Sequence, residues 1–109
     1  MASLKKLNTK DELYNFINNK GLNILKCSAN WCGPCRVLTA NIVSLDNNKV
    51  GTTNFSEIDV DENEFEDFIS EKRIMGIPVL IFYKDGAEVD RHVGLMTKEQ
   101  LYEKINELC

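Results

Sequence analysis

Apolar and polar positions along this 109-residue chain follow two spacings, which predict an alternation of helices and strands. A capping box from Thr9 to Glu12, followed by apolar residues at helical spacing, predicts a helix over residues 9–19. Short apolar runs predict internal strands over residues 23–29 and 52–60. Helical spacing returns over residues 34–45, where the expected inward face is Val37, Leu38, Ile42 and Leu45.

The second half of the chain combines helical and strand patterns. Residues 63–66 are expected to cap a third helix, and Thr97 to Gln100 open a last one. Between them, the apolar runs 79–83 and 87–93 flank an Asp85-Gly86 turn, which predicts a hairpin. Strand–helix–strand units followed by a hairpin and a helix predict one α/β domain over residues 1–109, a central mixed β-sheet with helices on both faces.

Composition and charge narrow the class of protein. Hydrophobic residues make up 43% and charged residues 28%, which are ordinary globular values. The net charge of −4, without a basic cluster, argues against nucleic acid as a partner. No apolar run is long enough for a membrane span, and the N-terminus lacks the apolar core of a secretory signal. We therefore expect a soluble, cytoplasmic protein, with a monomer as the default state.

The main candidate for chemistry is a pair of cysteines at the start of the second helix. Cys32 and Cys35 are three residues apart, so their side chains share a face and can close a disulfide. The unpaired N–H groups and the dipole of a helix start stabilise a thiolate, and the dipole lowers its pKa by about one. This predicts Cys32 as the nucleophile and Cys35 as the resolving thiol.

The residues between and around the cysteines favour redox chemistry over metal binding. Pro34 fits a first helical turn, and Gly33 leaves room for the backbone of another protein. A zinc site needs a second pair of ligands, and the remaining candidates, which are Cys27, His92 and Cys109, lack the spacing. Cys27 is expected to be buried and Cys109 exposed. Met75 and Met96 are candidates for flexible substrate contacts, with ordinary packing as the alternative.

The sequence resembles the thioredoxin family over almost its whole length. The matching segments are residues 29–35, 76–78, 84–86 and 93–94. The resemblance implies a cis peptide bond before Pro78 and a substrate-docking surface around the cysteines. That surface would contain Trp31, Gly33, Pro34, Ile77, Pro78 and Gly94.

The resemblance also implies an activity. Cys32 would attack a disulfide of another protein, and Cys35 would release the mixed disulfide that forms. The resulting Cys32–Cys35 bond would be reduced by a thioredoxin reductase that draws on NADPH, with no cofactor bound to this chain.

Two positions depart from the family pattern. The family places a buried aspartate six residues before the first active-site cysteine, and here that residue is Lys26. The neighbouring strand carries Glu57 where the family has a lysine. We predict a Lys26–Glu57 ion pair behind Cys35, with Glu57 as a proton acceptor, because an isolated buried ammonium is costly. The alternative is that only the stem of Lys26 is buried and its ammonium reaches water.

Lys26 keeps a second function open. A cation near the cysteines favours their thiolates and makes the disulfide more oxidising, as in a disulfide oxidase or isomerase, unless Glu57 cancels the charge. A third hypothesis is a binding subunit in which the cysteines have no catalytic role. Replacing both cysteines with serine would distinguish it, because a scaffold would keep its partner's activity.

Overall fold

A five-stranded mixed sheet forms the centre of the protein in the computed structural model, which covers residues 1–109. The strand order is β1-β3-β2-β4-β5. β2 pairs in parallel with β3 and antiparallel with β4, and β4 pairs antiparallel with β5. The predicted mixed sheet is therefore confirmed. The strands are β1 Lys5–Lys6, β2 Leu22–Ser28, β3 Asn54–Asp59, β4 Val79–Lys84 and β5 Ala87–Val93.

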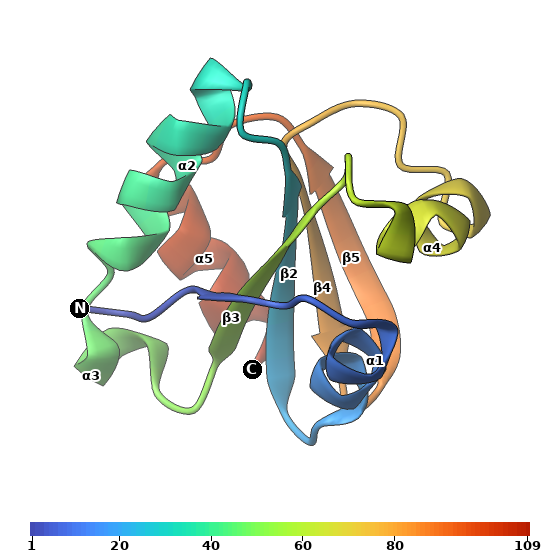
Figure 1. The fold of residues 1–109 in the computed structure, drawn as a ribbon. Coiled ribbons are helices and arrows are strands. Elements are labelled where there is room, and N and C mark those ends of the chain that lie inside the picture. The colour runs from blue at the N-terminus through green and yellow to red at the C-terminus, as the bar shows by residue number, and fades with distance from the viewer.

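Helices cover both faces of this sheet, as predicted (Figure 1). Figure 1 shows α2 and α5 on one side and α1 and α4 on the other. Two separate clusters of buried apolar side chains, one on each face, join these helices to the strands. The helices are α1 Lys10–Asn18, α2 Gly33–Val43, α3 Asn47–Val50, the 3-10 turn η1 Asn63–Phe65, α4 Glu66–Glu71 and α5 Lys98–Leu108.

Alternation along the strands explains the two clusters. In β4, Leu80 and Phe82 belong to the cluster under α2 and α5, whereas Ile81 belongs to the cluster under α1 and α4. In β2, Ile24 faces the α2 side and Leu25 the opposite side. The same alternation places Lys26, two residues after Ile24, on the face that α2 covers.

Several sequence predictions need correction. Val37 is 48% exposed and does not lie on the buried face of α2. Asn63 caps no helix, because η1 precedes α4 and neither has a side-chain cap. The sequence analysis did not predict α3, which Asp46 starts by accepting a hydrogen bond from the Asn48 N–H at 2.9 Å. The edge strand β1 was missed because it is only two exposed lysines long.

The predicted capping boxes and the predicted hairpin turn are confirmed. Thr9 and Thr97 form capping boxes at the starts of α1 and α5. The β4–β5 turn has positive φ at both Asp85 and Gly86, which suits the Asp-Gly sequence. Among the helices, none has the length and apolar character needed to cross a membrane.

Candidate active site

Cys32 and Cys35 lie at the start of α2, directly after the loop that follows β2, and they are joined by a disulfide. Cys32 is the N-cap residue, and its Sγ accepts a hydrogen bond from the Cys35 backbone N–H at 3.2 Å. Pro34 occupies the first turn, where its missing N–H costs nothing. The helix start therefore directs an N–H group at the sulfur of Cys32, as the sequence predicted.

The two sulfurs face different hollows. Both cysteines are buried, but Cys32 lines an open surface groove of about 510 Å³. Cys35 is not part of the groove and lines a separate, smaller cavity of about 150 Å³, which opens to the surface beside the exposed Asn30 and Arg36. A partner protein in the groove would reach Cys32 first. This arrangement supports Cys32 as the attacking sulfur and Cys35 as the resolving one.

The groove beside Cys32 is mainly apolar. Trp31 forms one wall with 68% of its surface exposed, and its indole N–H donates a hydrogen bond to Asp61 Oδ2 at 2.7 Å. That bond fixes the ring although most of it is in solvent. The complete lining is Trp31, Cys32, Gly33, Pro34, Val60, Ile69, Ile74, Met75, Gly76 and Ile77.

Most of the docking residues expected from the family resemblance line this groove. Trp31, Gly33, Pro34 and Ile77 are among them, and the Ile77–Pro78 bond is cis, as expected. Pro78 itself is buried and lies outside the groove lining, as does Gly94. The Gly94 N–H donates to the Pro78 carbonyl at 2.8 Å, so these two residues hold each other.

Sequence reasoning did not assign the far wall of the groove. Val60 follows β3, Ile69 lies in α4, and Ile74 follows that helix, so three segments converge there. In the sequence these residues look like ordinary core positions. The sequence analysis also did not assign Asp61, which accepts the hydrogen bond from the Trp31 indole. Only the exposed Met75 carried a signal, because a flexible apolar side chain in solvent suggests a contact surface.

Lys26 and Glu57 form an ion pair, with 3.6 Å between Lys26 Nζ and Glu57 Oε1. The strand register places them side by side, because β2 and β3 pair Lys26 with Glu57. The Lys26 side chain is only 2% exposed, so its ammonium does not reach bulk water, whereas Glu57 is 25% exposed. Ser28 adds a weak hydrogen bond from its hydroxyl to Glu57 Oε1 at 3.4 Å.

The ion pair lines the same cavity as Cys35. Lys26, Glu57 and Cys35 together line the 150 Å³ cavity, with Ser28, Ala29, Asn30, Arg36 and Thr39. Burial lowers the pKa of Lys26, and the Glu57 carboxylate acts in the opposite direction. The cavity thus joins the resolving sulfur to a buried cation and to a carboxylate that reaches solvent.

The remaining candidate residues take no part in this site. Cys27 is buried, and burial raises the pKa of its thiol to about 12, which leaves it unreactive. Cys109 is exposed at the chain end, with its sulfur 3.8 Å from Thr53 Oγ1. His92 Nε2 lies 3.1 Å from the Leu95 carbonyl. No group of three or more potential metal ligands comes together.

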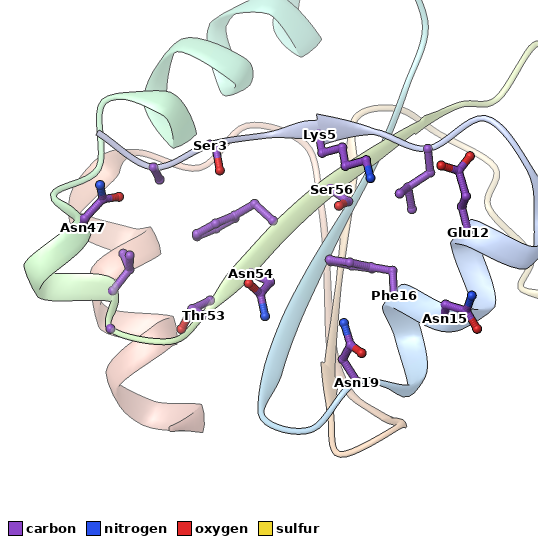
Figure 2. Close-up of a pocket in the computed structure, with 15 residues that line it drawn as sticks. Ser3, Lys5, Glu12, Asn15, Phe16, Asn19, Asn47, Thr53, Asn54 and Ser56 are labelled. Carbon is purple, nitrogen blue, oxygen red and sulfur yellow. The ribbon is translucent and has the colours of Figure 1, made fainter.

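A separate polar hollow of about 520 Å³ lies between the N-terminal segment, α1, α3 and the start of β3 (Figure 2). Figure 2 shows amide and hydroxyl side chains around it, including Asn15, Asn19, Asn54 and Ser56. It contains no cysteine and none of the site residues predicted from the sequence. It therefore does not belong to the cysteine site.

A closable cysteine pair at a helix start, beside an apolar groove and on a mixed sheet, defines a dithiol–disulfide oxidoreductase. Comparison with known proteins narrows this class, because the sequence profile of the thioredoxin family matches residues 4–107. The chain belongs to the thioredoxin family. It is 39% identical over 93 residues to thioredoxin from Staphylococcus saprophyticus, covering 84% of this chain and 88% of that one. Thioredoxin from Chlamydia caviae is 35% identical over 96 residues, covering 88% and 91% of the two chains.

Solved structures agree with this assignment. Thioredoxin from Fasciola hepatica superimposes with a TM-score of 0.81 at 31% identity, covering 96% of this chain and 99% of that one. Oxidised thioredoxin from Plasmodium falciparum gives a TM-score of 0.82 at 26% identity, covering 96% and 97%. The protein is accordingly a disulfide reductase that works by dithiol–disulfide exchange through Cys32 and Cys35.

Proposed function

We propose that the protein is a general electron carrier that reduces disulfides of other proteins and is itself recycled by a thioredoxin reductase using NADPH. The observation that carries the proposal is that the two cysteines line separate cavities, Cys32 the apolar groove beside Trp31 and Cys35 the smaller cavity beside Lys26 and Glu57. It would work as a monomer and as a single domain over residues 1–109, in a reducing compartment such as the cytoplasm.

The first step takes place in the groove. The Cys32 thiolate attacks one sulfur of the substrate disulfide, which forms a mixed disulfide and releases the other substrate sulfur as a thiolate that takes up a proton. Trp31, Gly33, Pro34 and Ile77 would hold the substrate backbone and its apolar side chains against Cys32. The buried Pro78 and the half-buried Gly94 would support this surface from outside the groove lining.

The second step takes place at Cys35, beside the 150 Å³ cavity. Cys35 loses its proton and attacks Cys32 Sγ, which releases the second substrate sulfur and leaves the Cys32–Cys35 disulfide. The substrate gains two electrons and the protein loses two. We propose that the proton leaves through the 150 Å³ cavity to Glu57, which is the member of the pair in contact with solvent. Lys26 would favour the thiolate of Cys35 during this step.

Lys26 also supports the alternative of a more oxidising oxidase or isomerase. Its ammonium is buried beside the cavity, and a cation there stabilises the reduced form. Glu57, however, lies 3.6 Å from it and offsets most of that charge. We therefore place the reductase role first.

A coupled assay tests the recycling. Thioredoxin reductase, NADPH and a disulfide-bonded protein are combined with this chain, and NADPH absorbance is followed. We expect NADPH consumption that requires this chain and matches the substrate disulfides reduced, and none with a Cys32→Ser, Cys35→Ser double variant. Substrate reduction by the chemically reduced protein without NADPH turnover would show that the electrons come from another donor.

A further inference from the structure

The groove beside Cys32 continues past Met75 into a second groove over α4. The first measures about 510 Å³ and the second about 550 Å³. They share four lining residues, Val60, Ile69, Ile74 and Met75. Met75 lines both grooves, is 95% exposed and has a flexible side chain, so it can adapt to a segment that lies across them.

The second groove combines an apolar wall with acidic side chains. The four shared residues are its apolar part. Its other lining residues carry three carboxylates, from Asp61, Glu62 and Glu66, and a single cation, Arg73. Glu62 forms an ion pair with Lys6, with 3.3 Å between Glu62 Oε1 and Lys6 Nζ. Asp61 and Glu66 form no ion pair.

A lysine or arginine side chain matches both features of this groove. Its methylene stem covers apolar surface while its charged end stays in water near carboxylates. Asp61 also links the two grooves, because it accepts the hydrogen bond from the Trp31 indole. A chain segment that passes from Cys32 over Met75 would therefore place a side chain beside Asp61 and Glu66.

We propose that the second groove is a specificity site that takes a basic side chain from the same extended substrate segment whose cysteine reacts with Cys32. The inference rests on the proposed function, since it names a class of preferred substrate for that reaction. The second groove is continuous with the docking groove and supplies the complementary charge.

The test uses short cysteine peptides linked as mixed disulfides to nitrothiobenzoate. The peptides differ at one residue, which is lysine, norleucine or glutamate. This residue is placed at successive distances before or after the cysteine. The reduced protein attacks each mixed disulfide and liberates the coloured nitrothiobenzoate thiolate, whose absorbance gives the rate. At one spacing and low ionic strength we expect the lysine peptide to react about two- to fivefold faster than the glutamate peptide. Salt should remove the difference.

Glu66→Lys should reverse this preference at that spacing. Glu71→Lys is the matched control, because it makes the same charge change in α4 but lies in neither groove lining, and it should leave the preference unchanged. Equal rates for all peptides, or equal effects of both variants, would overturn the second site and leave the reductase function standing. Failure to react with any peptide would instead count against the proposed function itself.

Discussion

Replacing Cys32 with serine is expected to abolish disulfide reduction completely, whereas replacing Cys35 with serine should stop the reaction halfway. A serine hydroxyl at position 32 stays protonated at neutral pH and does not attack disulfides. With Cys35→Ser, Cys32 still attacks from the groove, but no second thiol releases the substrate. The protein should then accumulate as a mixed disulfide with its substrate.

Mass spectrometry after mixing with a disulfide-bonded protein distinguishes these outcomes. Cys35→Ser should gain the mass of one substrate chain through Cys32, and Cys32→Ser should gain nothing. Cys109→Ser serves as the control, because it removes an exposed thiol outside the site and should retain full turnover. Adduct formation by Cys32→Ser through Cys35 would reverse the assignment of the two sulfurs.

Glu57→Gln is expected to destabilise the fold by about 2–3 kcal/mol at neutral pH, because it leaves the buried ammonium of Lys26 without its counter-charge. Lys26→Met should act in the opposite direction and stabilise by about 1 kcal/mol. Methionine fills similar space without a buried charge, and Glu57, which is a quarter exposed, is left where water reaches it. Denaturant unfolding of the oxidised proteins measures both changes.

The pH dependence of the free energy of unfolding gives a second test of the buried Lys26 ammonium. Burial lowers the pKa of Lys26 in the folded protein below its ordinary value of about 10.5, so the unfolded chain holds that proton more tightly. The cost of burying the ammonium is full below the lowered pKa and disappears as pH rises toward about 10.5. The advantage of Lys26→Met should shrink over the same range.

An exposed ion pair provides the control for these measurements. Lys10 and Asp67 lie 3.7 Å apart with side chains 49% and 80% exposed. Lys10→Met and Asp67→Asn should each change the free energy of unfolding by less than about 1 kcal/mol. If Glu57→Gln were as mild as Asp67→Asn, the Lys26 ammonium would have to be hydrated, and the buried pair would be wrong.

Much of this architecture could be predicted from local sequence signals. Capping boxes at Thr9 and Thr97, the Asp85-Gly86 turn and the spacing of apolar residues each act over a few residues, and each predicted its element. The cysteine spacing and the residues around it predicted the disulfide and the hydrogen bond to Cys32. β1 and α3 are too short to carry a periodic pattern, so the sequence analysis did not predict them.

The rest of the site depends on long-range packing. The Lys26–Glu57 pair was foreseen only because the family resemblance aligned the two strands, and the structure adds that the lysine is the more deeply buried partner. Val60, Ile69 and Ile74 come from three separate segments and line one groove with Trp31, and no local pattern indicates that. The exposure of Val37 likewise follows from how α2 rests on the sheet.

The equilibrium potential of the Cys32–Cys35 couple against a glutathione buffer tests the reductase assignment most directly. It should be measured for the native protein and for a variant that combines Lys26→Asp with Glu57→Lys. We expect a native couple more reducing than glutathione. The exchange of charges should shift its potential by less than about 30 mV, because the paired charges largely cancel. A native couple more oxidising than glutathione, made reducing by the exchange, would contradict the reductase assignment and favour an oxidase set by Lys26.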